Sequence, residues 1–145
     1  MDVLFIKSLN EFLEYWEKSS LSSFEKMISE DYKAREIRNG AIVDFGYEES
    51  IKGWKEGFTY VLRNRAFWDI KKIFMFPLNS EEVLVCLVAT IVTNDHDINT
   101  ANIFFETFRK ETSNEWKLVR SYIEAGVPNE YLSALHLFNE NTIID

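Results

Sequence analysis

Apolar residues recur at helical spacing in the first part of the chain, and they predict two helices. Ser8 and Glu11 form a capping-box pattern, which is typical of a helix start. The residues that follow place apolar side chains on one helical face: Leu9, Phe12, Leu13 and Trp16. This pattern predicts a first helix over about residues 8–18. A second, shorter helix is predicted to open at Ser22 and Ser23.

A hairpin and a third helix follow. Asn39-Gly40 is the strongest short hairpin signal, since both central positions of a type I′ turn need positive φ, and two short strands should flank it. The stretch YEESIKGWKEGFTYVLRN then predicts a helix with one apolar face: Ile51, Trp54, Phe58, Val61 and Leu62. Gly53 and Gly57 lie one turn apart on this helix, and each costs about 1 kcal/mol relative to alanine. The pair therefore indicates close packing or a functional approach to the backbone.

The period of the apolar pattern changes to two after the third helix. Four stretches alternate in this way and predict long strands: AFWDIKKIFMF, EEVLVCLVATIVT, TANIFFETFRKE and EWKLVRSYIEAG. Short segments rich in turn residues separate them, so consecutive strands should pair antiparallel as a meander. Beyond Pro128 the stretch NEYLSALHLFNE predicts a terminal helix, with Tyr131, Leu135 and Phe138 facing inward.

These elements predict one domain of the α+β class. The order is helix, helix, hairpin, helix and four strands, and helices gathered on one face of an antiparallel sheet are typical of this class. Long strands must twist, so we expect a cone-shaped, curved antiparallel sheet wrapped around the three helices of the N-terminal half. The domain is expected to span residues 1–145, with residues 127–145 as a C-terminal extension.

Composition narrows the class of function. Of 145 residues, 46% are hydrophobic and 15% aromatic, which indicates either an aromatic core or rings that line a ligand cavity. The net charge of −8 argues against binding to nucleic acid and to anionic membranes. The one cysteine, Cys86, lies in an apolar run and is expected in the core. No cationic leader followed by an apolar stretch opens the sequence, so we expect a cytoplasmic protein.

The stretch ANIFFETFRK puts a carboxylate on an aromatic strand face. In a strand, Asn102, Phe104, Glu106 and Phe108 share one side. A buried carboxylate is costly unless it is paired, hydrogen-bonded or protonated. Glu106 therefore lines a pocket with a raised pKa, pairs with an Arg or Lys, or stays solvated near the strand end. We favour the pocket acid, because perturbed acids concentrate in functional clefts.

The order of elements and two strand endings resemble a known superfamily. The helix–helix–hairpin–helix opening and the endings FETFRK and WKLVRSYIEAG resemble the nuclear transport factor 2-like superfamily, which includes SnoaL-like cyclases and ketosteroid isomerases. The resemblance covers about residues 8–126. It implies a cystatin-like curved sheet around a hydrophobic pocket, and a homodimer formed through the convex face of the sheet. Functions on such a fold range from isomerisation and cyclisation to binding without catalysis.

The resemblance also implies roles for particular residues. The carboxylate base of the ketosteroid isomerases corresponds to Glu36, and their protonated acid, which donates a hydrogen bond to an oxyanion, corresponds to Glu106. Both are Glu where those enzymes carry Asp, and Phe12 stands where they carry a tyrosine. In the last strand the resemblance turns Val119, Ser121 and Ile123 toward the pocket, and Trp116, Leu118, Arg120 and Tyr122 toward the convex side.

Further candidates complete the predicted site. The residues expected to contact a ligand are Tyr15, Trp16, Tyr32, Trp54, Phe58, Asn102, Phe104, Phe108 and Ser121. Most of the first five are expected in the core, with two or three touching the ligand, and Asn102 could orient a carbonyl or hydroxyl. Asp44 borders either the pocket mouth or the surface. His96 lies between two aspartates, but the chain has one other histidine, His136, so a hairpin turn is favoured over a metal site. No phosphate-binding loop is visible, and no cofactor is predicted.

Three functions are compatible with these residues. The first is binding of a small, mostly apolar organic molecule in an aromatic-lined pocket, and the incomplete acid set leaves it nearly level with the second. The second is general acid–base isomerisation or cyclisation, with Glu106 as the pocket acid and Glu36 as its partner. The third is a dimeric protein-interaction module that works through the convex sheet and the tail.

Overall fold

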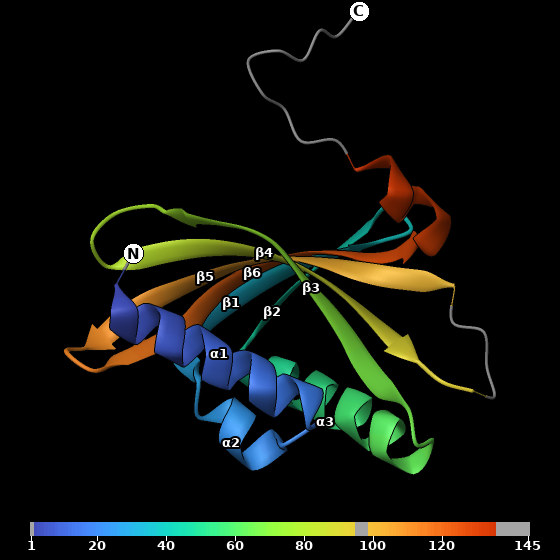
Figure 1. Cartoon of the computed structure of the whole chain (residues 1–145), viewed down its shortest axis with the longest axis horizontal. Coiled ribbons are helices and arrows are strands. Elements are labelled where there is room, and N and C mark those ends of the chain that lie inside the picture. The colour runs from blue at the N-terminus through green and yellow to red at the C-terminus, as the bar shows by residue number, and fades with distance from the viewer. Residues whose placement is uncertain (1, 95–98, 136–145) are drawn as a thin grey trace, which may run out of the picture.

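The computed structural model describes residues 2–94 and 99–135, which form three α-helices on one side of a six-stranded sheet (Figure 1). The helices are α1 (Val3–Glu17), α2 (Leu21–Glu25), α3 (Tyr47–Arg63) and a short 3₁₀ helix, η1 (Asn129–Ala134). The strands are β1 (Ile28–Arg38), β2 (Ala41–Gly46), β3 (Phe67–Pro77), β4 (Glu82–Val92), β5 (Thr100–Thr112) and β6 (Glu115–Pro128). The predicted α+β class is confirmed. None of the helices formed by these residues is long and apolar enough to cross a membrane.

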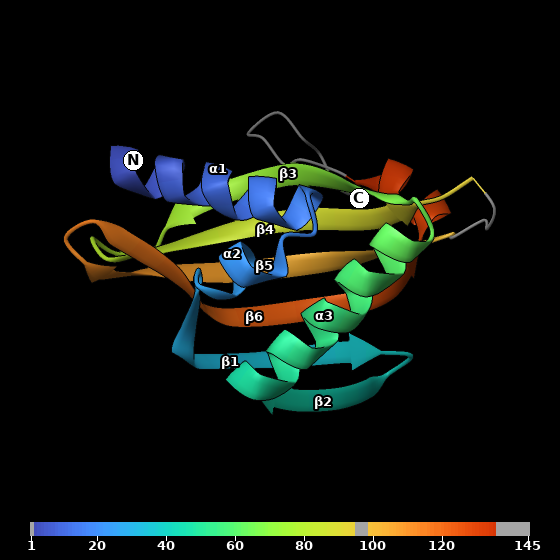
Figure 2. The same ribbon diagram turned by 90° about the horizontal axis from the view of Figure 1, so that it is seen from below.

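The sheet has the strand order β2-β1-β6-β5-β4-β3. Strands β3 to β6 pair antiparallel in sequence order, which confirms the predicted meander. β1 and β2 form the predicted hairpin, although β1 is longer than expected, and the turn residues Asn39 and Gly40 have φ of 51° and 78°. The sequence did not indicate that β1 pairs parallel with β6. Helix α3 allows this pairing, because it carries the chain across the sheet face from β2 to β3 at the opposite edge (Figure 2).

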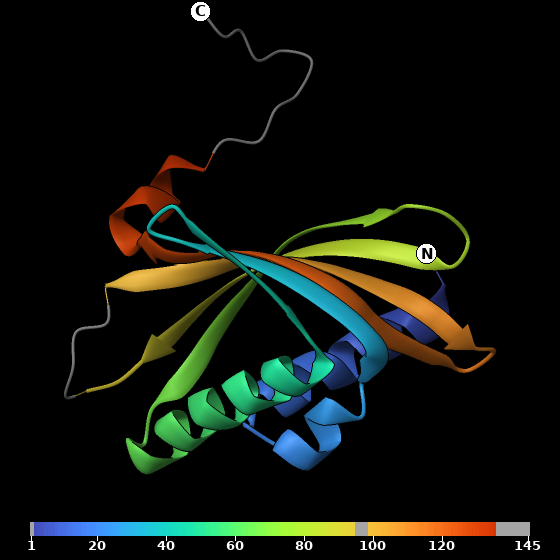
Figure 3. The same ribbon diagram turned by 180° about the vertical axis from the view of Figure 1, so that it is seen from behind.

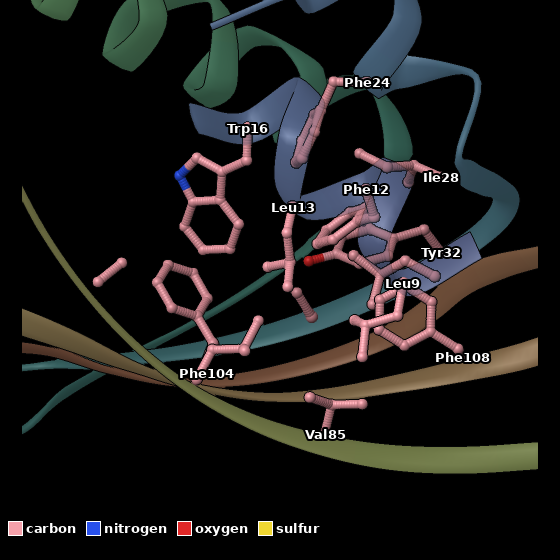
Figure 4. Close-up of a cluster of buried hydrophobic side chains, with 14 of the residues drawn as sticks. Leu9, Phe12, Leu13, Trp16, Phe24, Ile28, Tyr32, Val85, Phe104 and Phe108 are labelled. Atoms are coloured by element: carbon pink, nitrogen blue, oxygen red, sulfur yellow. The ribbon is translucent and has the colours of Figure 1, made fainter. Parts of the chain in front are cut away.

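All three α-helices lie on the concave face of the twisted sheet (Figures 1 and 3). α1 contacts β3 and β6, while α3 contacts β1, β2 and β3. The core between these layers is aromatic: the ring centroid of Phe12 lies 4.7 Å from that of Phe24 and 5.1 Å from that of Phe108. Figure 4 shows these side chains gathered between the helices and the sheet. Burial of each large apolar side chain contributes about 1.5–3 kcal/mol to folding.

The predictions for the start of the first helix and for the terminal helix are wrong. α1 begins at Val3, where Asp2 is the N-cap and its Oδ1 accepts a hydrogen bond from the Leu4 N–H at 2.8 Å. Ser8 is buried inside the helix, so it caps nothing. After β6, the described residues form the short η1 rather than the predicted terminal helix, and both Tyr131 and Leu135 are exposed. His96, His136 and Phe138, on which predictions were also made, lie outside the described residues.

The first half of β6 turns its side chains opposite to the prediction. Trp116 and Leu118, predicted on the convex side, are buried in the core. The cause is an irregularity in the pairing of β5 with β6, where Thr107 pairs with Arg120 but the next β5 residue pairs with Leu118. The extra residue, Val119, exchanges the two faces of the strand. Beyond this bulge the residues lie on the predicted faces: Arg120, Ser121, Tyr122 and Ile123.

Candidate functional site

A cavity of about 640 Å³ lies between α3 and the concave face of the sheet, and we call it the α3 cavity. Its α3 residues are Glu49, Ser50, Gly53, Trp54 and Gly57. Its strand residues are Tyr32, Glu36, Arg38, Val43, Asp44, Phe45, Trp68, Ala89, Thr90, Ile91, Thr100, Asn102, Phe104 and Ile123. The volume lies within the range of about 300–1,000 Å³ that is usual for ligand pockets.

Aromatic rings form the wall where the helix meets the sheet. Trp54 of α3 stacks on Phe104 of β5 with a centroid distance of 6.0 Å and an interplanar angle of 21°, and it lies 6.4 Å from Trp68 of β3. A Cβ on Gly57 would lie 3.8 Å from the Trp68 ring, which is an ordinary contact. A Cβ on Gly53 would meet no atom within 4 Å. Close packing, one of the two explanations predicted for this glycine pair, therefore does not apply to Gly53.

Four charged residues line the cavity, and each has a partner. Glu36 Oε2 lies 3.7 Å from Nε of Arg38. Asp44 accepts two hydrogen bonds from Arg35, at 2.7 Å from Nε and 2.9 Å from Nη2, and these bonds hold the pKa of Asp44 below its usual value. Glu49 accepts a hydrogen bond from a backbone N–H at the start of α3, at 3.0 Å. The lining thus contains three carboxylates and one guanidinium, all paired.

Glu106 is fully buried and is not among the residues that line the cavity. Strand pairing puts it between Val85 of β4 and Ser121 of β6. Ser121 Oγ donates a hydrogen bond to Oε1 of Glu106 at 2.5 Å, whereas Oε2 has no partner among the described residues. Burial raises the pKa of Glu106 to about 8, against the opposing effect of the Ser121 hydrogen bond. No described Arg or Lys pairs with it, so Glu106 is a desolvated acid that is mainly protonated at neutral pH.

Tyr32 connects this buried acid with the α3 cavity. Its side chain is buried and lines the cavity. Burial, and then the nearby Glu106 carboxyl, raise the pKa of the Tyr32 phenol well above its usual value, while the hydroxyls of Ser121 and Ser50 act in the opposite direction. Tyr32 therefore remains a neutral phenol. Ser50 is also buried and lines the cavity, and although its Oγ lies near the phenol, it is in hydrogen-bonding geometry with none of the described residues.

The predicted site residues fall into three groups. Five of them line the α3 cavity: Tyr32, Glu36, Trp54, Asn102 and Phe104. Asn102 also accepts a hydrogen bond from the backbone N–H of Gly126 at 3.0 Å through Oδ1. Four others lie in the core or against it: Tyr15, Trp16, Phe58 and Phe108. The remaining two, Glu106 and Ser121, are joined by the buried hydrogen bond and do not line the cavity.

Sequence reasoning missed several cavity residues. Ser50 precedes Trp54 by one helical turn, so the periodicity that turns Trp54 inward also turns Ser50 inward. Arg38 follows Glu36 by two positions and therefore shares its strand face. Trp68 had no comparable signal, because its strand lies at the edge of the sheet and its neighbours there depend on tertiary structure.

Comparisons with known proteins identify the fold. No protein-family model matches the chain, and no curated protein matches its sequence. A domain of unknown function with a cystatin-like fold from Nostoc punctiforme has a TM-score of 0.62 and 14% identity, covering 88% of this chain and 78% of that chain. An NTF2-like protein from Cytophaga hutchinsonii has a TM-score of 0.60 and 13% identity, covering 86% and 99%. A scytalone dehydratase-like protein from Novosphingobium aromaticivorans has a TM-score of 0.59 and 14% identity, covering 86% and 89%.

The chain therefore has the cystatin-like fold of NTF2-like proteins, with a curved sheet and helices on its concave face. The resemblance that the sequence suggested is confirmed at the level of fold. Such a likeness at low identity does not establish function, because one fold carries many activities.

Proposed function

We propose that this protein binds a small, mostly apolar organic molecule in the α3 cavity. The observation that carries this proposal is the cavity, whose aromatic walls surround a few polar groups. The rings are Trp54, Trp68 and Phe104, and the polar side chains are Tyr32, Ser50 and Asn102. Ligand sites in proteins typically combine apolar walls with a small number of polar groups that orient the ligand.

A matched pair of variants tests this proposal. Ile91→Trp adds a large ring to the β4 wall of the cavity, whereas Ile42→Trp adds the same ring at an exposed β2 position outside it. Amide chemical shifts are followed while a library of neutral aromatic compounds is added. We expect wild type and Ile42→Trp to bind alike, and Ile91→Trp to bind about tenfold more weakly or worse. A library without binders, or binders that do not distinguish the three proteins, contradicts the proposal.

General acid–base catalysis is a second candidate function. The observation that favours it is Glu106, a buried acid with a pKa of about 8, close to the working pH that such catalysis requires. Because Glu106 does not line the cavity, it would act on a ligand through Ser121 and Tyr32. Glu36 lines the cavity directly. The scytalone dehydratase-like neighbour is named for a reaction that removes water, and such a step uses an acid and a base.

Deuterium exchange of a cyclic ketone tests the catalytic candidate. In D₂O a base removes the α-protons of 2-tetralone and deuterium from the solvent replaces them, so their NMR signals disappear. The rate of this loss is compared among wild type, Glu106→Gln and Glu36→Gln. The control is Glu115→Gln, whose side chain is exposed. Catalysis by these acids predicts rates that are about 10²–10⁴-fold lower in the first two variants and unchanged in the control. Equal rates in all four proteins would exclude this candidate and leave binding.

We also propose that two copies associate through the convex face of the sheet. Three aromatic side chains form a row across this face: Phe105 lies 6.5 Å from Phe74 and 6.0 Å from Tyr122 between ring centroids. Phe74 and Tyr122 are 42% and 41% exposed. An exposed apolar row on a sheet face supports association with another protein surface.

A further inference from the structure

We propose that the ligand of the α3 cavity is a flat, neutral molecule with a carbonyl group. Its flat body lies against the helix face formed by Gly53 and Gly57, and its carbonyl oxygen accepts hydrogen bonds from Ser50 and Tyr32. This inference rests on the proposed binding function and adds the chemical class of the ligand.

The two glycines keep the helix side of the cavity bare. Both line the cavity, and neither has the positive φ that would require glycine. Packing does not require them either, since a Cβ would meet open space at Gly53 and make an ordinary contact at Gly57. Each glycine nevertheless costs α3 about 1 kcal/mol relative to alanine. With positive φ and close packing excluded, what the two glycines provide is free space beside the helix. A flat molecule can use this space to approach the helix backbone.

An unpaired hydroxyl on the same helix gives an independent indication of a ligand. Ser50 is only 4% exposed. Its Oγ lies near the Tyr32 phenol, whose pKa it lowers, but it meets the geometry of a hydrogen bond with none of the described residues. It precedes Gly53 by three positions and therefore lies on the same side of α3. A buried polar group without a partner is unfavourable, so the hydroxyl fits an acceptor supplied by a ligand. The neutral phenol of Tyr32 lies near Ser50 and offers a second donor.

The charges of the cavity favour a neutral ligand. An anion would meet three carboxylates and one guanidinium in a protein of net charge −8. A cation would find no free carboxylate, because Glu36, Asp44 and Glu49 each already have a partner. A carbonyl oxygen accepts two hydrogen bonds without carrying a charge, and so it matches the two hydroxyl donors.

Two fluorescent probes of the same shape test the inference. Prodan is a flat, neutral naphthyl ketone. 2-Dimethylamino-6-propylnaphthalene is the same molecule with a CH₂ group in place of the carbonyl, and we call it the parent amine. Fluorescence titration of the full chain gives Kd for both. We expect the wild type to bind the ketone about 3–10-fold more tightly than the parent amine. Ser50→Ala and Tyr32→Phe should each reduce this preference without changing the Kd of the parent amine.

A second pair of variants tests the glycine face. Gly53→Leu should weaken both probes by about tenfold or more, because the added side chain occupies the space of the flat ring system. Thr59→Leu places the same side chain on the outer face of α3, away from the cavity, and should change neither Kd. Gly53→Ala adds a single methyl group and is the milder variant if the leucine disturbs folding.

The outcomes separate this inference from the proposed function. Equal affinity for the two probes, or a preference that survives both Ser50→Ala and Tyr32→Phe, overturns the carbonyl subsite. Unchanged binding in both Gly53 variants overturns the glycine face. In these cases the proposed function stands if Ile91→Trp still weakens probe binding. If neither probe binds, the inference is overturned, and if the aromatic library also gives no binder, the proposed function is overturned with it.

Discussion

Replacing Glu106 with glutamine should change how the stability of the protein depends on pH. In the folded protein burial raises the pKa of this carboxyl from 4.5 to about 8. In the unfolded chain the carboxyl is solvated and ionises near its usual value. Between these two pKa values the folded state keeps a proton that the unfolded state has lost, so the free energy of unfolding falls as pH rises. The contribution is fully present below the unfolded pKa and is lost as pH passes through about 8.

The size of this effect follows from the two pKa values. They differ by about 3.5, from 4.5 to about 8, and each pKa unit corresponds to about 1.4 kcal/mol. The loss therefore approaches about 5 kcal/mol at about pH 9, a large part of the roughly 5–15 kcal/mol that holds a domain folded. Glutamine has nearly the same shape as the protonated acid and does not ionise. Glu106→Gln should match wild type within about 1 kcal/mol at about pH 5 and be several kcal/mol more stable at about pH 9.

Urea unfolding, followed by tryptophan fluorescence from about pH 5 to about pH 9, measures this difference. The control is Glu115→Gln, which removes an exposed carboxyl at the start of β6. All other groups titrate alike in the three proteins, so they cancel when stabilities are subtracted. If the stability curves of wild type and Glu106→Gln run parallel across this range, Glu106 ionises without penalty, and the reasoning from a buried, unpaired carboxyl is refuted.

Three further changes test the core, the helix and the convex face. Phe12→Ala removes a fully buried ring and should lower the free energy of unfolding by about 3–5 kcal/mol in urea titrations; a loss under about 1 kcal/mol would contradict the packing. Gly53→Ala should raise the midpoint of thermal unfolding, corresponding to about 0.5–1 kcal/mol, because its methyl group meets open space; a lower midpoint would show strain. Tyr122→Glu should give monomers in sedimentation experiments at concentrations where wild type is a dimer. The control Leu62→Glu, at an exposed position of α3, should remain a dimer. If Tyr122→Glu also remains a dimer, the convex face is not the interface.

The fold could be predicted because most of it depends on local patterns. The helical spacing around Trp54 and the alternation around Glu106 each specify an element and most of its inward face without reference to distant residues, although Leu62, predicted on the apolar face of Trp54, is exposed. The parallel pairing of β1 with β6 has no such signal, since it joins segments that are far apart in the chain. The same holds for the bulge at Val119, where a single unpaired residue reverses the faces of Trp116 and Leu118.

The site could be predicted only in part, for a related reason. Trp16 and Trp54 both lie on inward helical faces, and the sequence gives them the same pattern. One is fully buried in the core while the other borders a cavity, because α1 and α2 fill one part of the concave face and α3 leaves space above the other. An inward side chain has the same periodicity whether its neighbour is another ring or a void. The cavity is therefore a property of how the helices are placed, and the sequence pattern does not encode it locally.

The hydroxyls of Ser121 and Tyr32 connect Glu106 with the α3 cavity. The protonation state of Glu106 decides how many hydrogen-bond donors these hydroxyls can offer to a ligand. A serine hydroxyl carries one hydrogen, and when Ser121 donates it to Glu106 it has none left for Tyr32. When Glu106 is protonated, as its raised pKa favours, the acid can donate to Ser121 instead, and the hydrogens of Ser121 and Tyr32 become available toward the cavity. A neutral Glu106 therefore gives the cavity end one more donor than an ionised one, which suits a ligand that accepts hydrogen bonds. The proton that stabilises the fold is thus the same proton that favours a carbonyl ligand. The preference for the ketone over its parent amine should therefore fall as pH passes through about 8, where the loss of stability that begins near pH 4.5 is complete.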